Sequence, residues 1–373
     1  MINGMLDFLW SCFPVKSRKI LFISHLGKGY GCNPKYICEY ILQNHHDEFD
    51  LHWLYDPTCS DTNNIPKGVI PVNLYSWQFR YDILTCGVLI SNTRLPNWFH
   101  YKKRKGQRYI QTWHSSLRLK RIEGDAHLNE TYESIAKEDS RKTSVIVSGC
   151  RFSSEIYKRA FWYNGPLLEV GTPRVDFLIN QHISKRKSLC VKAKLNSQVH
   201  YVLYAPTFRK GGAMDAYNID YKRLTETLTT RYGGQWKVLS KLHPNLLGKV
   251  SFQSLGEHCI DVTWYDDIQE LLIIADMLIT DFSSCMFDMA YLKKSCILYA
   301  SDYEQYVRTE RDLYFDIREL PFPLAVNNEE LNDVINGLDA TNYLENIKSF
   351  LSKIGSFESG KACEKIYNYI KQS

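Results

Sequence analysis

The sequence predicts an α/β fold with parallel sheets covered by helices. Short apolar segments typical of buried strands alternate with segments of helical periodicity, and this alternation implies parallel strands with both faces covered. The chain has 373 residues, of which 44% are hydrophobic, so it is too long for one ordinary core. The pattern also restarts after residues 171–173. We therefore expect two domains.

The first half contains strands and helices in alternation. An apolar strand beginning at Arg18 leads into a loop with Gly27, Gly29 and Gly31, which lets a substrate approach the backbone but makes no dinucleotide fingerprint. The expected helices are 33–43, 128–139 and 152–161, and the further expected strands are 51–55, 88–91, 109–113 and 144–148.

The second half repeats this alternation. Its expected helices are 175–179, 221–232 and 266–274, and its expected strands are 200–205, 236–242, 277–279 and 296–299. A closing helix is predicted over 361–371. The expected domains are therefore 1–172 on the acceptor side, 173–350 on the donor side, and a C-terminal closing segment, 351–373.

Charge and cysteine content narrow the class of protein. Lys and Arg total 46 against 41 acidic residues, a mild excess that suits anionic ligands or a membrane face and does not indicate nucleic acid. A basic run covers 102–108, although a solvated loop is the commoner meaning of such runs. The eleven cysteines include no C-x-x-C pair, which favours reduced thiols in the cytoplasm and no zinc site.

The N-terminal segment 1–13 is apolar but is interrupted by Asp7. It lacks a small-residue cleavage site and is too short to span a bilayer. Two interpretations remain: a helix at the membrane interface, or a segment packed on the protein. Together with the basic run, it suggests a peripheral contact with the inner face of the membrane.

Residues 276–289 form the most informative stretch. An apolar run ends at Asp281, and Ser283 and Ser284 then precede apolar residues at helical spacing. This order predicts a strand, then a turn, then the first turn of a helix. Such an arrangement directs backbone N–H groups and two hydroxyls at one point, where the helix dipole favours a phosphate. The alternative is that Ser283 merely caps the helix.

Two other strands of the second half also end in polar residues. Thr207 and Arg209 follow the strand 200–205, and His243 follows the strand 236–242. Loops at the carboxyl ends of parallel strands gather at one edge of a sheet, where ligands bind. We therefore expect these residues to converge with Ser283 and Ser284.

This set of side chains matches a diphosphate. Arg209 offers a planar fork of donors, and His243 adds an imidazole. Asp281 lies in the turn itself, and no carboxylate cluster accompanies it, so we expect no metal and no other cofactor. Asp288, about a turn and a half into the helix, suits the hydroxyls of a ribose, or is a simple surface carboxylate.

In the first half, His114 ends the segment 109–113 on a loop. A lone histidine is more often structural, but at a strand end facing a cleft its near-neutral pKa suits a base that deprotonates a hydroxyl. The basic residues after it would attract an anionic acceptor. A Ser-His-Asp hydrolase is disfavoured because the chain has no G-x-S-x-G elbow.

Motifs spread over nearly the whole chain resemble the CDP-glycerol glycerophosphotransferase family, whose members make teichoic-acid-type polymers and also occur in capsule and lipopolysaccharide clusters. No single motif is decisive, but their order and spacing are specific. They occupy residues 31–36, 90–96, 112–114, 204–209, 242–244, 280–284 and 314–316. One departure is that Ser115-Ser116-Leu117 follows the Trp-His pair, where the family often has Gly-Thr-Pro.

The resemblance implies a GT-B-like architecture, with two Rossmann-like domains whose parallel sheets face a central cleft. It also implies transfer of glycerol phosphate from CDP-glycerol to an acceptor hydroxyl of a glycan or lipid-linked polymer, with release of CMP. On this basis His114 is the general base and His243 a second catalytic residue. The donor is held by Thr207, Arg209, Asp281, Ser283, Ser284 and Asp288.

Three alternatives remain open. A GT-B glycosyltransferase that uses a nucleotide sugar would share the phosphate-binding helix start. CDP-ribitol is a close variant of the donor, because no residue of the sequence distinguishes the two polyols. A catalytically silent member that binds anionic glycan at the membrane would not need both histidines and Arg209.

Overall fold

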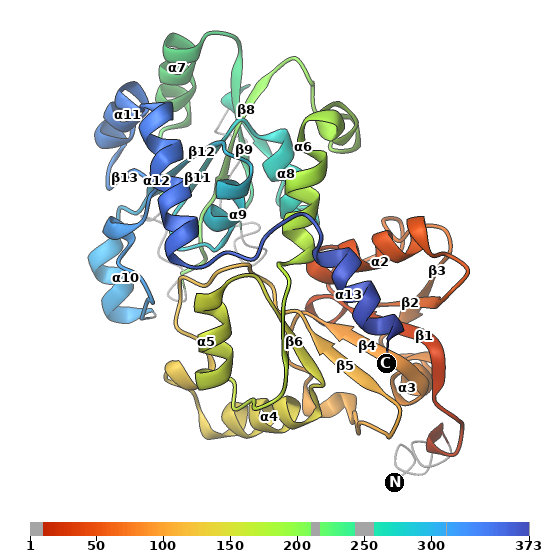
Figure 1. Cartoon of the computed structure of the whole chain (residues 1–373). Helices are drawn as coiled ribbons and strands as arrows, with labels where there is room; N and C mark the ends of the chain where they lie inside the picture. The colour runs from red at the N-terminus through yellow and green to blue at the C-terminus, as the bar shows by residue number, and fades with distance from the viewer. Residues whose placement is uncertain (1–9, 210–216, 243–256, 311, 373) are drawn as a thin grey trace. The chain divides into compact units, whose positions relative to one another are not determined.

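The computed structural model describes residues 10–209, 217–242, 257–310 and 312–372, with only the backbone of residues 181–183 (Figure 1). The chain divides into two compact units. The first unit comprises Met1–Ser116, Ile122–Phe177 and Ser356–Ser373, and the second comprises Leu117–Arg121 and Leu178–Gly355. The boundary falls inside helix α6 (Pro173–Lys192). The domain limits 172/173 and 350/351 stay a prediction.

The first unit is built on a parallel sheet of seven strands within the described residues. The strand order is β3-β2-β1-β4-β5-β6-β7, and each neighbouring pair is parallel. The strands are β1 (Lys16–Ile23), β2 (Asp50–Tyr55), β3 (Val69–Asn73), β4 (Cys86–Ser91), β5 (Arg108–Gln111), β6 (Val145–Ser148) and β7 (Leu167–Glu169).

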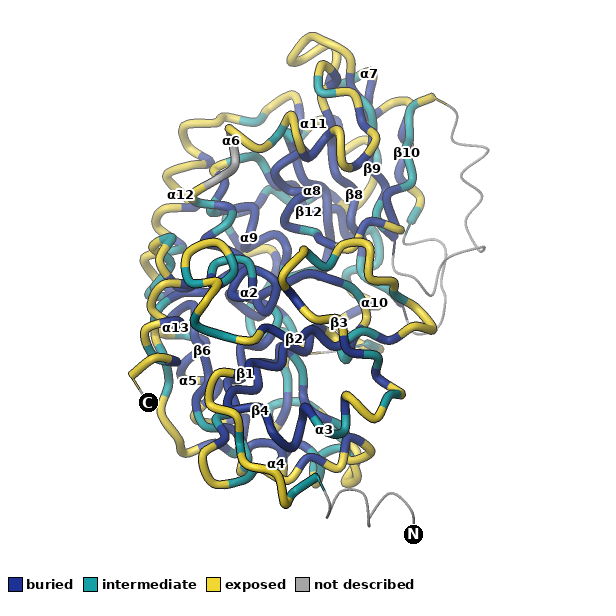
Figure 2. The backbone as a smooth tube through the Cα atoms, turned by 90° about the vertical axis from the view of Figure 1, so that its right-hand side faces the viewer, coloured by how far each residue is buried: buried dark blue, intermediate teal, exposed yellow. Residues whose placement is uncertain are grey.

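Helices cover both faces of this sheet. On one face, α2 and α13 pack on side chains from β1, β2, β4, β5 and β6. On the other face, α3 packs on the alternate side chains of β1, β2, β4 and β5. Figure 2 shows β1, β2 and β4, in the middle of the sheet, mostly buried, and the exposed residues mainly on loops and outer helix sides. The helices are α2 (Cys32–Asn44), α3 (Trp77–Thr85), α4 (Glu130–Lys142), α5 (Arg151–Ala160) and α13 (Ala362–Lys371).

The second unit repeats the architecture with six parallel strands in its described part. Their order is β10-β9-β8-β11-β12-β13. One face is covered by α7 and α11, and α8 and α9 contact the sheet as well. The strands are β8 (His200–Ala205), β9 (Trp236–Ser240), β10 (Cys259–Asp261), β11 (Met277–Thr280), β12 (Ser295–Tyr299) and β13 (Leu324–Ala325). The helices are α7 (Tyr221–Tyr232), α8 (Ile268–Ile274), α9 (Cys285–Tyr291), α10 (Tyr303–Thr309), α11 (Asn328–Gly337) and α12 (Ala340–Lys353).

The two sheets share one connectivity, and the predicted α/β class with parallel sheets is confirmed. In each sheet the chain starts in the middle, moves to one edge, and then returns to build the other side. The direction reverses between β1 and β4 in the first unit and between β8 and β11 in the second. Ligands of open α/β sheets bind at the carboxyl ends of such strand pairs. The central cleft between the sheets stays a prediction.

Several element limits differ from the sequence prediction. The strand expected over 109–113 ends at Gln111, and Trp113 adopts a left-handed φ of 51°. The helix expected over 175–179 continues to Lys192, because its basic side chains lie on an exposed surface that the hydrophobic pattern does not mark. The strands β3, β7, β10 and β13 were missed. They are the edge strands of the two sheets and have at most five residues each, so they give little periodic signal.

Glu358 fastens the C-terminal segment to the first unit. Its two carboxylate oxygens accept hydrogen bonds from Thr172 N at 2.8 Å and from Thr172 Oγ1 at 2.7 Å. The same oxygens lie 2.6 and 2.7 Å from the places where a Cβ would stand on Gly149 and Gly171. Only glycine therefore leaves room for this carboxyl group. Burial raises the pKa of Glu358 from 4.5 to about 8.

Glu358→Gln should remove a pH dependence of stability. A carboxyl whose pKa is raised in the folded state holds its proton more tightly there than in the unfolded chain. Its contribution therefore falls as pH rises from 4.5 to about 8. We expect the thermal midpoint of the variant, relative to wild type, to rise across this interval. Glu345→Gln on the exposed face of α12 is the control, and parallel midpoint curves for Glu358→Gln would contradict the assignment.

Candidate active site

The loops after β8 and β11 meet in the second unit, as the sequence predicts. Asp281 Oδ1 accepts hydrogen bonds from the backbone N–H groups of Thr207, at 2.8 Å, and Phe282, at 2.6 Å. Its Oδ2 accepts from Arg209 Nη2 at 2.8 Å. Asp281 is 2% exposed. Asp281 therefore connects the loops that follow β8 and β11, the two strands between which the direction of the sheet reverses.

Arg209 is buried in an ion-pair network. Its Nε and Nη2 donate to the two carboxylate oxygens of Asp302 at 2.6 and 2.9 Å, and Nη1 donates to the Thr207 carbonyl at 2.6 Å. The guanidinium also lies over the rings of Phe282 and Tyr306, at 5.1 and 4.7 Å. Burial disfavours the charged form, but the hydrogen bonds and charges of Asp302 and Asp281 outweigh it and raise the pKa of Arg209.

Ser283 and Ser284 lie at the start of α9, both partly exposed. Ser284 occupies the N-cap position without a capping hydrogen bond from its side chain, and Ser283 Oγ accepts a long hydrogen bond of 3.5 Å from Cys285 N. Thr207 Oγ1 is buried with no hydrogen-bond partner among the described residues. These three hydroxyls follow β8 and β11 and retain hydrogen-bonding capacity for a ligand.

Asp288 is 0% exposed, and its Oδ2 accepts from Gln269 Nε2 at 3.2 Å. A ribose cannot reach a carboxylate buried in this way without movement of α9 or α8. His243 lies outside the described residues, and its predicted role stays a prediction.

His114 follows β5 in the first unit and is partly exposed. Its Nδ1 lies 2.9 Å from the backbone oxygen of Asn92. A carbonyl oxygen only accepts, so Nδ1 must carry the proton, and the lone pair of the neutral ring is on Nε2. The ring also stacks on Trp113, with centroids 4.7 Å apart. A general base needs a ring nitrogen with a lone pair and a ring held in a fixed orientation, and these two contacts provide both.

Sequence reasoning missed the residues that surround His114. Asn92 follows β4 directly, and His25 follows β1, so the strand-end rule applied to Thr207 and Arg209 would have found both. Arg174 Nη1 donates to the His114 carbonyl at 2.6 Å and lies 3.7 Å from Cys32 Sγ. No pattern in the sequence connects Arg174 with His114, which precedes it by 60 residues.

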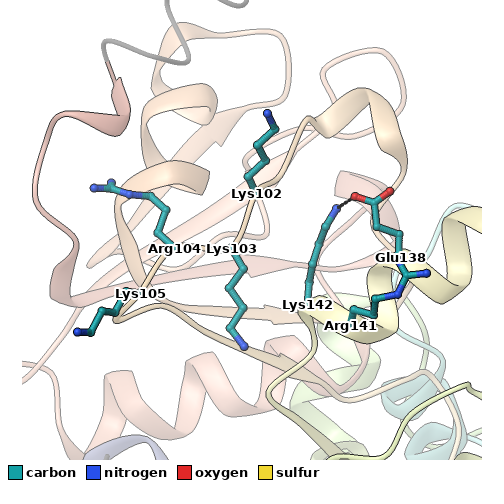
Figure 3. A pocket seen from close by; sticks show the side chains of 7 residues that line it. All are labelled: Lys102, Lys103, Arg104, Lys105, Glu138, Arg141 and Lys142. Carbon is teal, nitrogen blue, oxygen red and sulfur yellow. Dashed lines mark ion pairs between the residues drawn. The ribbon is translucent and has the colours of Figure 1, made fainter.

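The first unit also carries a basic hollow, whose lining includes none of the site residues described above. It has a volume of about 450 Å³ and is open to solvent. Six basic side chains and Glu138 line it, contributed by the loop before β5 and the end of α4 (Figure 3). Glu138 is paired with Lys142 at 2.7 Å. The basic residues are Lys102, Lys103, Arg104, Lys105, Arg141 and Lys142.

The described residues contain neither a cluster suited to a metal ion nor a helix suited to crossing a membrane. Within that part of the chain, no three His, Cys, Asp or Glu residues are grouped so that they could hold a metal ion. In the same residues, none of the helices is both long and apolar enough to cross a membrane.

The fold is that of an α/β protein with two Rossmann-like parallel sheets, and in the second unit two serines stand at the turn between β11 and α9. A family model described as CDP-Glycerol:Poly(glycerophosphate) glycerophosphotransferase matches residues 5–372. The chain belongs to this family.

Individual relatives agree with this assignment. The teichoic acid poly(glycerol phosphate) polymerase of Bacillus subtilis (strain 168) is 31% identical over 374 residues, covering 96% of this chain and 49% of the relative. The chain therefore spans about half the length of that polymerase. The teichoic acid poly(ribitol-phosphate) polymerase of Bacillus spizizenii (strain ATCC 23059 / NRRL B-14472 / W23) is 26% identical, covering 99% of this chain and 59% of the relative.

A solved structure of the wall teichoic acid polymerase TagF, from a variant soaked with CDPG, superposes with a TM-score of 0.87. It is 27% identical, and the match covers 99% of this chain and 92% of the other. The predicted two-sheet architecture is thus that of a known member of the family.

Arg209→Ala should destabilise the second unit, because it leaves Asp281 and Asp302 without their common partner. Removing one member of a buried ion pair costs roughly 3–5 kcal/mol. We expect a lower midpoint in denaturant unfolding. Arg318→Ala is the matched control, because Arg318 forms the same kind of fork with Asp316 on an exposed surface, where the change should be small. Equal midpoints for wild type and Arg209→Ala would refute the structural role.

Proposed function

We propose that this chain transfers glycerol phosphate from CDP-glycerol to a hydroxyl of a cell-surface polymer and releases CMP. The observation that carries the proposal is the 2.9 Å hydrogen bond between His114 Nδ1 and the Asn92 carbonyl, which leaves the lone pair of the neutral ring on Nε2. Family membership supplies the substrate class. The acceptor is a glycan or lipid-linked polymer, such as teichoic acid, capsule or lipopolysaccharide.

In this proposal the second unit holds the donor. Ser283, Ser284 and Thr207 bind the diphosphate through their hydroxyls, and His243 stabilises the departing CMP. Burial favours a supporting role for Arg209 and Asp281, which hold the two loops in place. Direct contact of Arg209 with the diphosphate, and of Asp288 with the ribose, stay predictions.

CDP-glycerol is proposed over CDP-ribitol because the family model names glycerophosphate and the glycerol phosphate polymerase is the more similar relative, 31% against 26% identical. No metal or other cofactor is included in the proposal. Turnover that stops in EDTA and returns with magnesium would contradict the metal-free part.

His114→Ala should bind CDP-glycerol like wild type and lose turnover, because the base acts on the acceptor and not on the donor. Loss of a general base costs typically 10²- to 10⁴-fold in rate. Binding is measured by calorimetric titration, and turnover by CMP release with a glycerol-phosphate primer. Unchanged turnover in His114→Ala would show that His114 is not the general base.

The same titration of wild type tests the donor class. CDP-glycerol, CDP-ribitol, UDP-N-acetylglucosamine and CMP-sialic acid are compared. Tight binding of a CDP-polyol alone supports the phosphotransferase, whereas preference for a nucleotide sugar would indicate a glycosyltransferase of the same fold.

A peripheral contact with the membrane at its inner face belongs to the same proposal. Phe13 is 45% exposed, and its carbonyl accepts from Arg104 Nη2 at 2.8 Å. The backbone of this exposed aromatic residue thus contacts Arg104, one of the residues that line the basic hollow. Apolar insertion beside a cluster of Lys and Arg is the combination that binds anionic lipid surfaces. Residues 1–9, for which the sequence predicts the same contact, lie outside the described residues.

Replacement of Lys102, Lys103 and Lys105 by Glu should abolish co-sedimentation with vesicles that contain phosphatidylglycerol. Each basic residue near an anionic surface contributes about 1 kcal/mol. Vesicles of phosphatidylcholine alone, and the variant Lys222→Glu on an exposed helix of the second unit, are the controls. Equal partitioning of wild type and the triple variant would show that the hollow does not bind the membrane. Equal partitioning after deletion of residues 1–13 would show the same for the N-terminal segment.

A further inference from the structure

Asn92 lies at the point where the first sheet reverses direction. It follows β4, it is 0% exposed, and its side chain reaches the loop that follows β1. Its Oδ1 accepts a hydrogen bond from the backbone N–H of His25 at 2.8 Å. Because an N–H group can only donate, this contact fixes which side of the amide is oxygen.

The other side of the amide holds the His25 ring. Asn92 Nδ2 lies 3.2 Å from His25 Nε2, and since the amide nitrogen donates, this ring nitrogen accepts. The backbone carbonyl of Asn92 accepts a hydrogen bond from His114 Nδ1. One buried asparagine therefore orients two histidines.

The two imidazoles lie next to each other. Their ring centroids are 5.8 Å apart and the rings are tilted by 57°. His25 is exposed and His114 is partly exposed, whereas Asn92 is buried. Both histidines are thus accessible from the surface, whereas Asn92, which contacts both of them, is buried.

The backbone at this place is strained. His25 and Trp113, the residue before His114, have left-handed φ values of 45° and 51°, and Cys32 has a φ of 60°. Such conformations cost of order 1–3 kcal/mol each and persist where the surrounding contacts impose them, often at functional sites. Asn33 Nδ2 supplies one such contact, to the carbonyl of Trp113 at 3.0 Å.

One positively charged side chain, Arg174, lies beside the pair. Arg174 contacts both the His114 carbonyl and Cys32 Sγ. Burial alone would raise the pKa of the Cys32 thiol, but Arg174 and His25 outweigh it and lower that pKa to about 7. The positive charge of Arg174 would stabilise an attacking oxygen that gains negative charge.

We propose that Asn92 is the positioning residue of this site, and that it holds His114 and His25 as one unit in which His114 Nε2 takes the proton of the acceptor hydroxyl. This inference rests on the proposed function. Asn92 acts only through the histidines and does not contact the reacting atoms.

The step balances without a further reactant. The acceptor oxygen forms a bond to the glycerol-bearing phosphorus, and its proton goes to His114 Nε2. The bond between that phosphorus and the bridging oxygen of the diphosphate breaks, and CMP leaves with the bridging oxygen and the electron pair. The imidazolium then returns its proton to water.

The test is a double-mutant cycle on turnover. A misplaced base costs on the order of 100-fold, so Asn92→Ala should lower kcat by about that factor and leave KM for CDP-glycerol unchanged. If Asn92 acts through His114, the double variant Asn92→Ala/His114→Ala should be no slower than His114→Ala alone. Additive losses would show a structural effect and overturn the inference.

A spectroscopic readout separates positioning from folding. In ¹⁵N NMR at neutral pH, His114 of the wild type should be protonated at Nδ1. Alanine keeps the backbone carbonyl that accepts from His114 but loses the amide that anchors this carbonyl to the loop after β1. Asn92→Ala should therefore let the carbonyl move and add the tautomer protonated at Nε2. An unchanged Nδ1 tautomer would overturn the inference. If Asn92→Ala does not fold, His25→Ala replaces it in the same cycle, because this ring is exposed.

Two further variants complete the design. His45→Gln alters a histidine of the same unit that stacks on Tyr367, and it should retain wild-type kcat. His114→Ala with full turnover would refute the proposed function itself. A slow His114→Ala with a fast Asn92→Ala would refute only the positioning role.

Discussion

Parallel strand pairing is the constraint on which both candidate sites depend. Parallel strands place all their carboxyl ends at one edge of the sheet, and the reversal of strand order brings the loops after two adjacent strands together there. In the first unit this joins the loops that carry His25 and Asn92, and in the second it joins Thr207 to Asp281. Residues more than 60 positions apart in the chain meet for this reason.

The two edges use their polar residues differently. In the second unit, charged side chains are buried and mutually satisfied, with Arg209 bound to Asp281 and Asp302, and hydroxyl groups remain for a ligand. In the first unit, a neutral amide is buried and two imidazoles are closer to the surface. A buried ion pair fixes loops rigidly, because separating the charges is costly. A neutral amide orients a base without adding charge beside it.

Much of the architecture could be predicted from residue patterns. The apolar runs 200–205 and 277–279 became β8 and β11, and the motif at Ser283 and Ser284 became the start of α9. Local patterns could not predict β13, whose two residues pair only because the edge of β12 is available. They also could not predict that Asp288 faces inward, because one carboxylate among apolar neighbours looks the same in sequence whether it is buried or exposed.

The sequence by itself determined the class of fold, the family, and the loops from which functional residues come, because hydrophobic periodicity and motif spacing are local properties of the chain. Only the tertiary structure decided what each side chain does within its loop. Arg209 connects two loops through a buried ion pair because Asp302, 93 residues away, lies beside it. His114 has a defined tautomer because the carbonyl of Asn92 lies against its ring. Hydrogen bonds between distant segments exist only once the sheets have formed.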